Sequence, residues 1–258
     1  HDLAGDLFNF DMRIRTMASY HLSIKSGKRG TAAEHAAYIA REGKYARGDG
    51  ANDLVVKVFG NLPDWADDNP STQWRYADRG ERTNGAAYRE IVVALPKEQS
   101  HQENLNLVMD FVDQELGEKA YQLAIHAPQA ALGKVAQPHA HIMFSDRMPD
   151  GIKRSREQHF KRYNPFKPAL GGCKKDSGGK DRATLRNNLI ALRASWAALQ
   201  NAHLQKNGHA TRVDHRSNKA RGIGRKAERH EGQVRIMNMT VEDKESLLAG
   251  RQDGQPPA

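Results

Sequence analysis

The chain has 258 residues, long enough to bury a full core as one large domain or as one domain with appendages. Its hydrophobic fraction is 38%, and it carries a formal net charge of +9. The single cysteine, Cys173, excludes an intramolecular disulfide framework and suits a reducing cytoplasm. No apolar run approaches the roughly 18 residues that span a bilayer, so we expect no membrane insertion, and the positive charge favours a polyanionic partner.

The spacing of apolar residues predicts alternating strands and helices in the first half of the chain. The predicted strands cover residues 18–25, 54–59 and 86–96, and the predicted helices cover residues 31–43, 71–82 and 100–117. Thr31 with Glu34, and Ser100 with Glu103, match the capping box that begins many helices. We therefore expect helices to begin at these two positions.

Two histidines lie one residue apart in the apolar stretch QPHAHIMFSD, residues 137–146. Side chains alternate between the faces of a strand, so His139 and His141 share one face. They could clamp a metal ion, or they could belong to the solvated face of an antiparallel sheet. The preceding predicted strand, residues 120–126, ends in His126. If the two strands form a long-looped hairpin, His126 joins the same face, and a third imidazole favours the metal site.

Residues 152–186 differ in composition from the rest of the chain. Eleven lysines and arginines against three acidic residues give this segment a net charge of +8. A charged run is often only solvated surface, but aromatic residues are interleaved with the cations here. This mixture is typical of surfaces that neutralise phosphates and stack unpaired bases. The candidate DNA contacts are Arg154, Arg156, Lys161, Arg162 and Tyr163.

A long amphipathic helix follows the basic segment and ends near Gly208, and the sequence becomes polar and weakly patterned after about residue 217. The order of the predicted elements indicates an α+β fold. We expect two layers, with a central antiparallel sheet of about five strands and helices on one face. The three-histidine metal site would then lie on the open face.

A set of three histidines leaves metal positions free for water or substrate. Zinc suits imidazole ligands in general, whereas manganese or magnesium suit a site that phosphate oxygens complete. A metal ion so placed would polarise a phosphodiester, and the basic composition indicates that the phosphodiester belongs to nucleic acid.

The sequence resembles the relaxase domain of the MobA/MobL plasmid mobilisation proteins, which are HUH endonucleases. The resemblance rests on MASYHLSIKSGKRGTAAEHAAYIAREGKYARG, YREIVVALP, LAIHAP followed by PHAHIMFSDR, HFKRYNP and ATRVDHRS, in this order. It covers roughly residues 17–224. Residues 1–16 would then be an N-terminal extension or added residues, and residues 225–258 a polar tail or linker.

This resemblance implies an enzyme that nicks one DNA strand at an origin of transfer. Such an enzyme stays attached to the 5′ phosphate through a tyrosine and rejoins the ends after transfer. His126, His139 and His141 would be the metal ligands, with Mn²⁺ or Mg²⁺, and Tyr38 would be the nucleophile. The implied partners are origin DNA that is single-stranded near the nick, accessory relaxosome proteins and a coupling protein. The implied location is the bacterial cytoplasm.

The residues alone support Tyr38 less strongly, because an isolated helical tyrosine is usually a packing residue. Glu34, Arg41 and Glu42 share its helix face, which makes that face look functional rather than buried. Tyr45, seven residues further on, is the main rival. A phenol with a reference pKa near 10 needs help from a base or from a metal ion at neutral pH.

Two acidic residues are candidates to assist the chemistry. Glu90 lies where the family has an acidic residue. It could orient a histidine or take the proton of the tyrosine nucleophile. It could equally be a surface carboxylate with no catalytic role. Asp214, beside His215, is the second candidate. Two competing functions also stay open: an HUH replication initiator or transposase, and a non-catalytic single-strand DNA-binding module.

Overall fold

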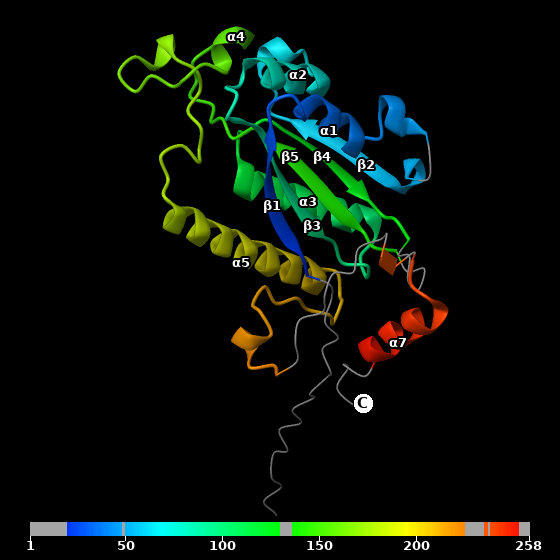
Figure 1. The fold of residues 1–258 in the computed structure, drawn as a ribbon. Helices are drawn as coiled ribbons and strands as arrows, with labels where there is room; N and C mark the ends of the chain where they lie inside the picture. The colour runs from blue at the N-terminus through cyan, green and yellow to red at the C-terminus, as the bar shows by residue number, and fades with distance from the viewer. Residues whose placement is uncertain (1–19, 48–49, 130–135, 225–234, 237, 253–258) are drawn as a thin grey trace, which may run out of the picture.

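The computed structural model describes residues 20–47, 50–129, 136–224, 235–236 and 238–252 (Figure 1). The predicted extension at residues 1–16 lies outside the described residues. So does much of the predicted tail, in which the structure describes the helix α7 (Val241–Gln252). No helix in the described part of the chain is long and apolar enough to cross a membrane.

A five-stranded sheet in the order β1-β3-β5-β4-β2 forms the centre of the fold, and every neighbouring pair is antiparallel. The strands are β1 (Leu22–Lys28), β2 (Leu54–Gly60), β3 (Ala86–Ala94), β4 (Tyr121–His126) and β5 (His139–Phe144). β4 and β5 are joined as a hairpin and lie beside each other in the sheet. The predicted α+β fold with a central antiparallel sheet of about five strands is confirmed.

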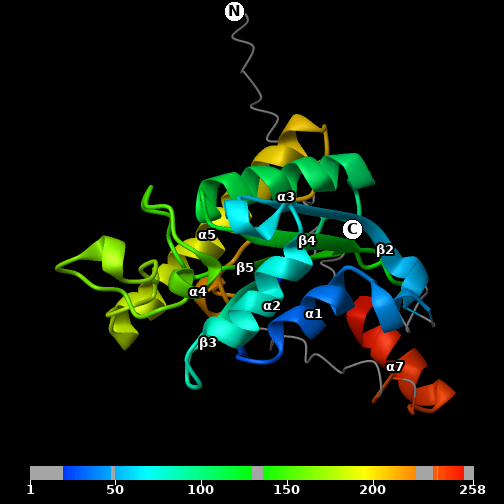
Figure 2. The same cartoon turned by 90° about the horizontal axis from the view of Figure 1, so that it is seen from above.

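Helices lie on both faces of this sheet (Figure 2). Besides α7, the longer helices are α1 (Ala32–Ile39), α2 (Pro70–Gly80), α3 (His101–Leu116) and α5 (Arg182–Lys206), and α4 (Arg156–His159) is a single turn. Short 3-10 helices cover Gly43–Ala46, Ala51–Asp53, Asp64–Ala66, Pro168–Leu170 and Lys219–Arg221.

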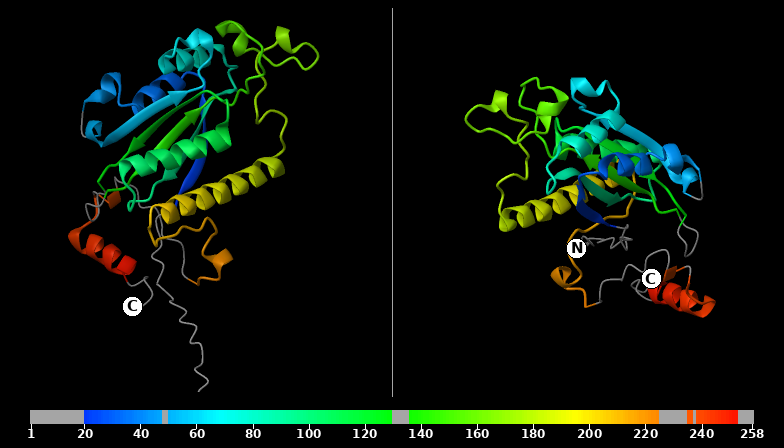
Figure 3. Two further views of the ribbon diagram at one scale, coloured as in Figure 1. Left: turned by 180° about the vertical axis from the view of Figure 1, so that it is seen from behind. Right: turned by 45° about the horizontal axis from the view of Figure 1, so that its top comes forward.

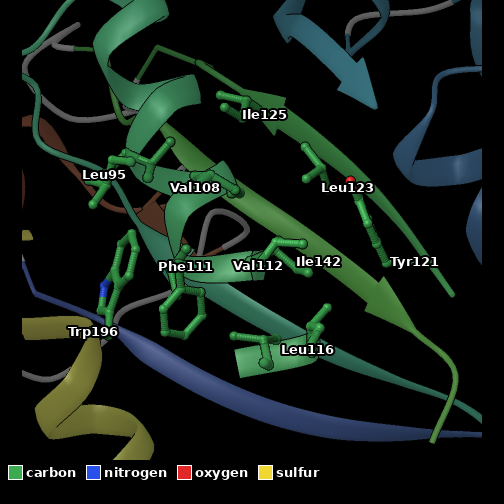
Figure 4. Packing of buried hydrophobic residues seen from close by; sticks show 14 of the residues in the cluster. Leu95, Val108, Phe111, Val112, Leu116, Tyr121, Leu123, Ile125, Ile142 and Trp196 are labelled. Carbon is green, nitrogen blue, oxygen red and sulfur yellow. The ribbon is translucent and has the colours of Figure 1, made fainter. Parts of the chain in front are cut away.

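The main core lies between the sheet and the pair α3 and α5, which run side by side (Figure 3). β5 contributes Ala140, Ile142 and Phe144 to this core, as the alternation of the strand predicts. Phe111 of α3 meets Trp196 of α5 with ring centroids 4.9 Å apart (Figure 4). The predicted capping box at the start of α3 is present, since Ser100 and Glu103 cap each other's backbone N–H groups.

The opposite face carries His126, His139 and His141, and we call it the histidine face. It is less open than expected, because α1 and α2 cover part of it. The alanines of α1 allow a close approach, and the buried side chain of Gln122 bridges the layers. Its Oε1 accepts from Nε1 of Trp74 at 2.9 Å, and its Nε2 donates to the Ala36 carbonyl at 3.0 Å. The helices thus frame the histidines.

The start of α1 differs from the prediction. Thr31 makes no capping bond to the helix, and its hydroxyl donates to the Lys28 carbonyl instead. Asp78 of α2 takes over the cap, accepting from the N–H groups of Ala32 and Ala33 at 2.9 Å each. A carboxylate at a helix N-terminus satisfies free N–H groups and opposes the positive end of the dipole. The capping box predicted there was wrong because a neighbouring helix supplies the cap.

Candidate active site

Three imidazoles gather at one end of the histidine face. His126 lies opposite His139 in the register of β4 and β5, and Ala124 lies opposite His141. The ring centroids of the three histidines are between 5.2 and 5.6 Å apart. The structure therefore brings together the three residues that the sequence placed on one face, and their role as ligands stays a prediction.

His126 is the most deeply buried of the three. One ring nitrogen, Nε2, lies 2.8 Å from the Ile39 carbonyl, and the other, Nδ1, lies 2.8 Å from Nη2 of Arg41. A carbonyl only accepts and a guanidinium only donates, so the proton belongs on Nε2 and the lone pair of Nδ1 faces Arg41. Burial lowers the pKa of His126 to about 4. The imidazole is therefore neutral at pH 7, as a metal ligand must be.

The other two imidazoles also have their Nδ1 atoms engaged. Nδ1 of His139 donates to the Gln137 carbonyl at 3.0 Å, and Nδ1 of His141 donates to Oε1 of Glu90 at 2.7 Å. In both rings the lone pair then belongs to Nε2. A carboxylate or carbonyl behind a histidine fixes its tautomer and orientation in many metal sites. Two of the three donors are thus ready for a metal ion, while the His126 lone pair is held by Arg41.

Glu90 is buried between two histidines. It accepts from His141 and, at the same oxygen, from Nε2 of His35 at 2.7 Å. Burial alone would raise the pKa of Glu90, but the two hydrogen bonds outweigh it and bring the pKa down to about 2. A carboxyl group with a pKa this low is a weak proton acceptor at neutral pH. Of the two roles open to Glu90, the structure favours orienting His141 over taking a proton.

Glu90, His35 and His141 also lie close enough together to hold a metal ion by themselves. The distances argue against that use. Oε1 of Glu90 is 2.7 Å from both ring nitrogens, as expected for hydrogen bonds to one shared acceptor. We therefore interpret this group as the support of His141 rather than as a second metal site.

Tyr38 lies near the end of α1, with its side chain 42% exposed. Its ring lies beside that of His35, with centroids 6.1 Å apart, and the Arg41 guanidinium carbon is 4.8 Å from its centroid. The next residue, Ile39, provides the carbonyl that binds His126. The backbone of Tyr38 is therefore tied to the histidine cluster while the ring stays accessible to a substrate.

Tyr45, the rival nucleophile, and Asp214, the second acidic candidate, each bind other side chains. Tyr45 donates its hydroxyl to Glu34, and this hydrogen bond raises the pKa of Tyr45. Asp214 pairs with Arg216 and Arg221, which lower its pKa. Neither contact involves the histidine cluster.

Comparison with known proteins decides the family. A model of the MobA/MobL family matches residues 29–240. The chain belongs to the MobA/MobL family. It is 53% identical over 210 residues to a 43 kDa relaxation protein of Salmonella typhimurium, covering 81% of this chain and 56% of that protein. It is 38% identical over 214 residues to mobilization protein A of Escherichia coli, covering 81% of this chain and 28% of that protein.

This MobA/MobL chain thus spans about half the length of the first of these relatives and less of the second. Its fold resembles a solved structure described as the molecular basis of vancomycin resistance transfer in Staphylococcus aureus. The two share 25% sequence identity with a TM-score of 0.55, over 78% of this chain and 100% of that one.

The basic segment of this MobA/MobL chain divides into buried and exposed cations. Arg154 is buried, paired through both terminal nitrogens with Asp150 and bonded to the Gly171 and Pro168 carbonyls. A guanidinium so enclosed cannot reach a phosphate, so the prediction that Arg154 contacts DNA was wrong. Composition alone does not distinguish an arginine that holds a loop together from one that faces solvent.

The other predicted DNA contacts are accessible to different degrees. Lys161 and Arg162 are exposed, and Tyr163 is half-buried. Arg156 is exposed too, but its Nε donates to Glu157 and its guanidinium carbon lies 4.7 Å from the centroid of the Tyr76 ring. Their contact with DNA stays a prediction.

Sequence reasoning missed His35 and Asp53. His35 had a usable signal, because it precedes Tyr38 by three residues and so shares its helix face. Asp53 had none: it lies in a short 3-10 helix and binds Nε and Nη2 of Arg41 at 3.0 and 2.9 Å. That pairing fixes the guanidinium that contacts His126.

Proposed function

We propose that this chain is a DNA relaxase that nicks one strand at a plasmid origin of transfer, with Tyr38 as the nucleophile. Residues 17–224 form the catalytic unit of this proposal. The observation that carries it is the link between α1 and the histidine cluster, made by the Ile39 carbonyl and Nε2 of His126 at 2.8 Å. The name of the Salmonella typhimurium relative, a relaxation protein, supports the same activity.

In the proposed reaction the phenolic oxygen of Tyr38 forms a bond to the scissile phosphorus. The 3′ oxygen of the cleaved strand leaves and takes up a proton to become a hydroxyl, which balances the proton that the phenol loses. The 5′ phosphate stays on the tyrosine. One phosphodiester replaces another, so the step is reversible and the strand can be rejoined after transfer. The exposure of the Tyr38 side chain supports this role, because a nucleophile must meet its substrate.

The three histidines fit a divalent metal ion, since their rings cluster with centroids 5.2 to 5.6 Å apart and three imidazole ligands leave positions for phosphate oxygens. We propose Mn²⁺ or Mg²⁺ held by His126, His139 and His141. A bound ion would polarise the phosphodiester and offset the charge that develops on its oxygens. Glu90 holds His141 in the tautomer that presents Nε2, and Arg41 must release Nδ1 of His126 or the ring must turn.

The proposed substrate is origin DNA that is single-stranded near the nick. Arg156, Lys161, Arg162 and Tyr163 would contact it outside the histidine cluster. The proposal also includes accessory relaxosome proteins and a coupling protein as partners, and the bacterial cytoplasm as the location.

The test is incubation with a supercoiled plasmid that carries the cognate origin of transfer, with and without Mn²⁺ or Mg²⁺, followed by protease digestion and gel electrophoresis. We expect metal-dependent conversion to the nicked form. The same assay with an unrelated replication origin separates a replication initiator or transposase. Binding of an oligonucleotide without any cleavage would contradict the proposal and favour a non-catalytic binding module.

A further inference from the structure

Residues 160–175, here called the basic loop, follow β5 and α4 and stand out from the body of the molecule (Figure 1). The loop carries the most exposed aromatic side chain among the described residues, Phe166, at 93% exposure. A single exposed apolar residue is ordinary on a protein surface. Two further features set Phe166 apart: the rigidity of its support and the unpaired charges on the same loop.

Buried arginines hold the base of the loop. Arg147 donates to the carbonyls of Phe160, Lys161 and Cys173, at 2.6, 3.2 and 2.7 Å, and its Nε pairs with the buried Glu81 at 2.7 Å. Charge-assisted bonds of this kind are the strong ones in proteins, particularly when they are buried. The two ends of the loop are therefore fixed to each other and to the body.

Close backbone contact tightens the loop further. Gly172 lies so near the Lys161 carbonyl that a Cβ atom there would be 2.1 Å from the oxygen. Arg154 adds bonds to two more carbonyls of the loop, those of Gly171 and Pro168. The basic loop is thus a packed structure and not a flexible connection.

The turn at the tip of the loop is also held in one conformation. Oδ1 of Asn164 accepts from the backbone N–H groups of Phe166 and Lys167, at 3.0 Å each. Pro165 fixes the intervening backbone. An aromatic ring on a fixed turn loses little conformational entropy when it binds a partner, which makes it an efficient contact.

The exposed cations of the loop are unpaired, in contrast to its buried ones. Among the residues that the structure describes, Lys161, Arg162, Lys167 and Lys174 form no ion pair through their side chains, whereas Lys175 pairs with Glu81. Free positive charges on the same loop as an exposed aromatic ring fit a partner that combines negative charge with flat apolar surfaces. Single-stranded nucleic acid is such a partner, because its phosphates and bases alternate.

We propose that Phe166 is a stacking platform for an unpaired base of the DNA strand, flanked by phosphate contacts from Lys161, Arg162 and Lys167. This proposal rests on the proposed relaxase function. The loop follows the Phe144 end of β5, while His139 begins that strand at its other end. Phe166 would therefore hold the DNA at a point away from the scissile phosphate. It contributes to DNA binding rather than to the chemical step.

The experiment compares two fluorescent probes of equal length, oligo(dT) and an abasic strand with the same number of phosphates. The wild type should bind oligo(dT) more tightly than the abasic strand. Phe166→Ala should lower the ratio of the two affinities by about tenfold, within the range for loss of one base stack. Phe166→Trp should preserve the preference. Lys167→Ala should instead weaken binding of both probes and flatten the salt dependence.

Leu170→Ala is the matched control, because Leu170 is another exposed apolar side chain of the same loop, at 68% exposure. It should leave the preference for oligo(dT) unchanged. The stacking proposal is overturned if Leu170→Ala lowers the preference for oligo(dT) as much as Phe166→Ala does. It is also overturned if Phe166→Ala changes the affinity for neither probe, or changes both affinities by the same factor. The melting temperature of each variant should match that of the wild type, because both side chains face solvent.

Formation of the covalent adduct by the wild type on origin DNA is measured in parallel. An adduct together with an unchanged preference in Phe166→Ala rejects the stacking role alone. A wild type that forms no adduct rejects the relaxase function on which the proposal rests.

Discussion

Nε2 of His35 lies 2.7 Å from Oε1 of Glu90, the same oxygen that accepts from Nδ1 of His141. This shared acceptor connects α1, which carries Tyr38, to β5, which carries two of the three clustered histidines. The helix of the proposed nucleophile and the proposed metal centre are therefore parts of one hydrogen-bonded unit.

Glu90→Ala should weaken Mn²⁺ binding by about 10- to 100-fold, the usual cost of removing the carboxylate behind a ligating histidine. Glu90→Gln should retain more of the affinity, because its amide oxygen still accepts from His141. Isothermal titration calorimetry measures both, with His139→Ala as the reference for loss of a proposed ligand. An affinity equal to that of the wild type in Glu90→Ala would show that Glu90 does not orient a ligand.

His35→Leu should lower the rate of adduct formation by about tenfold while the protein stays folded, because it removes the bond that ties α1 to Glu90. His35→Gln should restore most of the rate, since its amide N–H can donate to the same carboxylate. The rates are compared in single-turnover gel assays. Equal rates for the two variants would mean that the hydrogen bond plays no part.

Arg154→Ala should lower the free energy of unfolding by about 2 to 3 kcal/mol, because it leaves Asp150 and two loop carbonyls without their partner. Replacing the exposed pair Lys161 and Arg162 by alanine should leave stability within about 0.5 kcal/mol of the wild type. It should instead weaken DNA binding across all sequences. Urea denaturation and salt-dependent binding, run on both proteins, separate a structural arginine from DNA-contacting cations.

Burial lowers the pKa of His159 to about 4, so the folded protein keeps this imidazole neutral where the unfolded chain would protonate it. Stability should therefore fall as the pH drops from about 6.5 towards 4, by up to about 1.4 kcal/mol per pH unit from this residue. In His159→Gln the fall should be shallower, although His126 still contributes. Identical pH profiles of the free energy of unfolding in the two proteins would rule out this account.

Local patterns predicted the sheet and the histidine cluster because both follow from short-range geometry. The alternation of β5 separates His139 and His141 from the core, and the preceding strand adds His126 by simple pairing. The capping box at Ser100 was predictable for the same reason, since both partners lie within four residues.

Features made by distant residues were not predictable from local patterns. Asp78 caps α1 from a neighbouring helix, and Asp53 fixes Arg41 across a loop. The burial of Arg154 depends on carbonyls up to 17 residues away, which no charge pattern reveals. Each case is a tertiary contact that overrides a reasonable local expectation.

The central claim, that Tyr38 is the nucleophile, is tested most directly by mapping the adduct. The protein is reacted with origin DNA and Mn²⁺, digested with nuclease and trypsin, and analysed by mass spectrometry. Cleavage after Arg29 and Arg41 places Tyr38 in a different peptide from Tyr45, which follows Lys44. We predict a nucleotide attached to the Tyr38 peptide and no adduct in Tyr38→Phe. A nucleotide on the Tyr45 peptide, or nicking by the wild type with no modified peptide, would contradict the account.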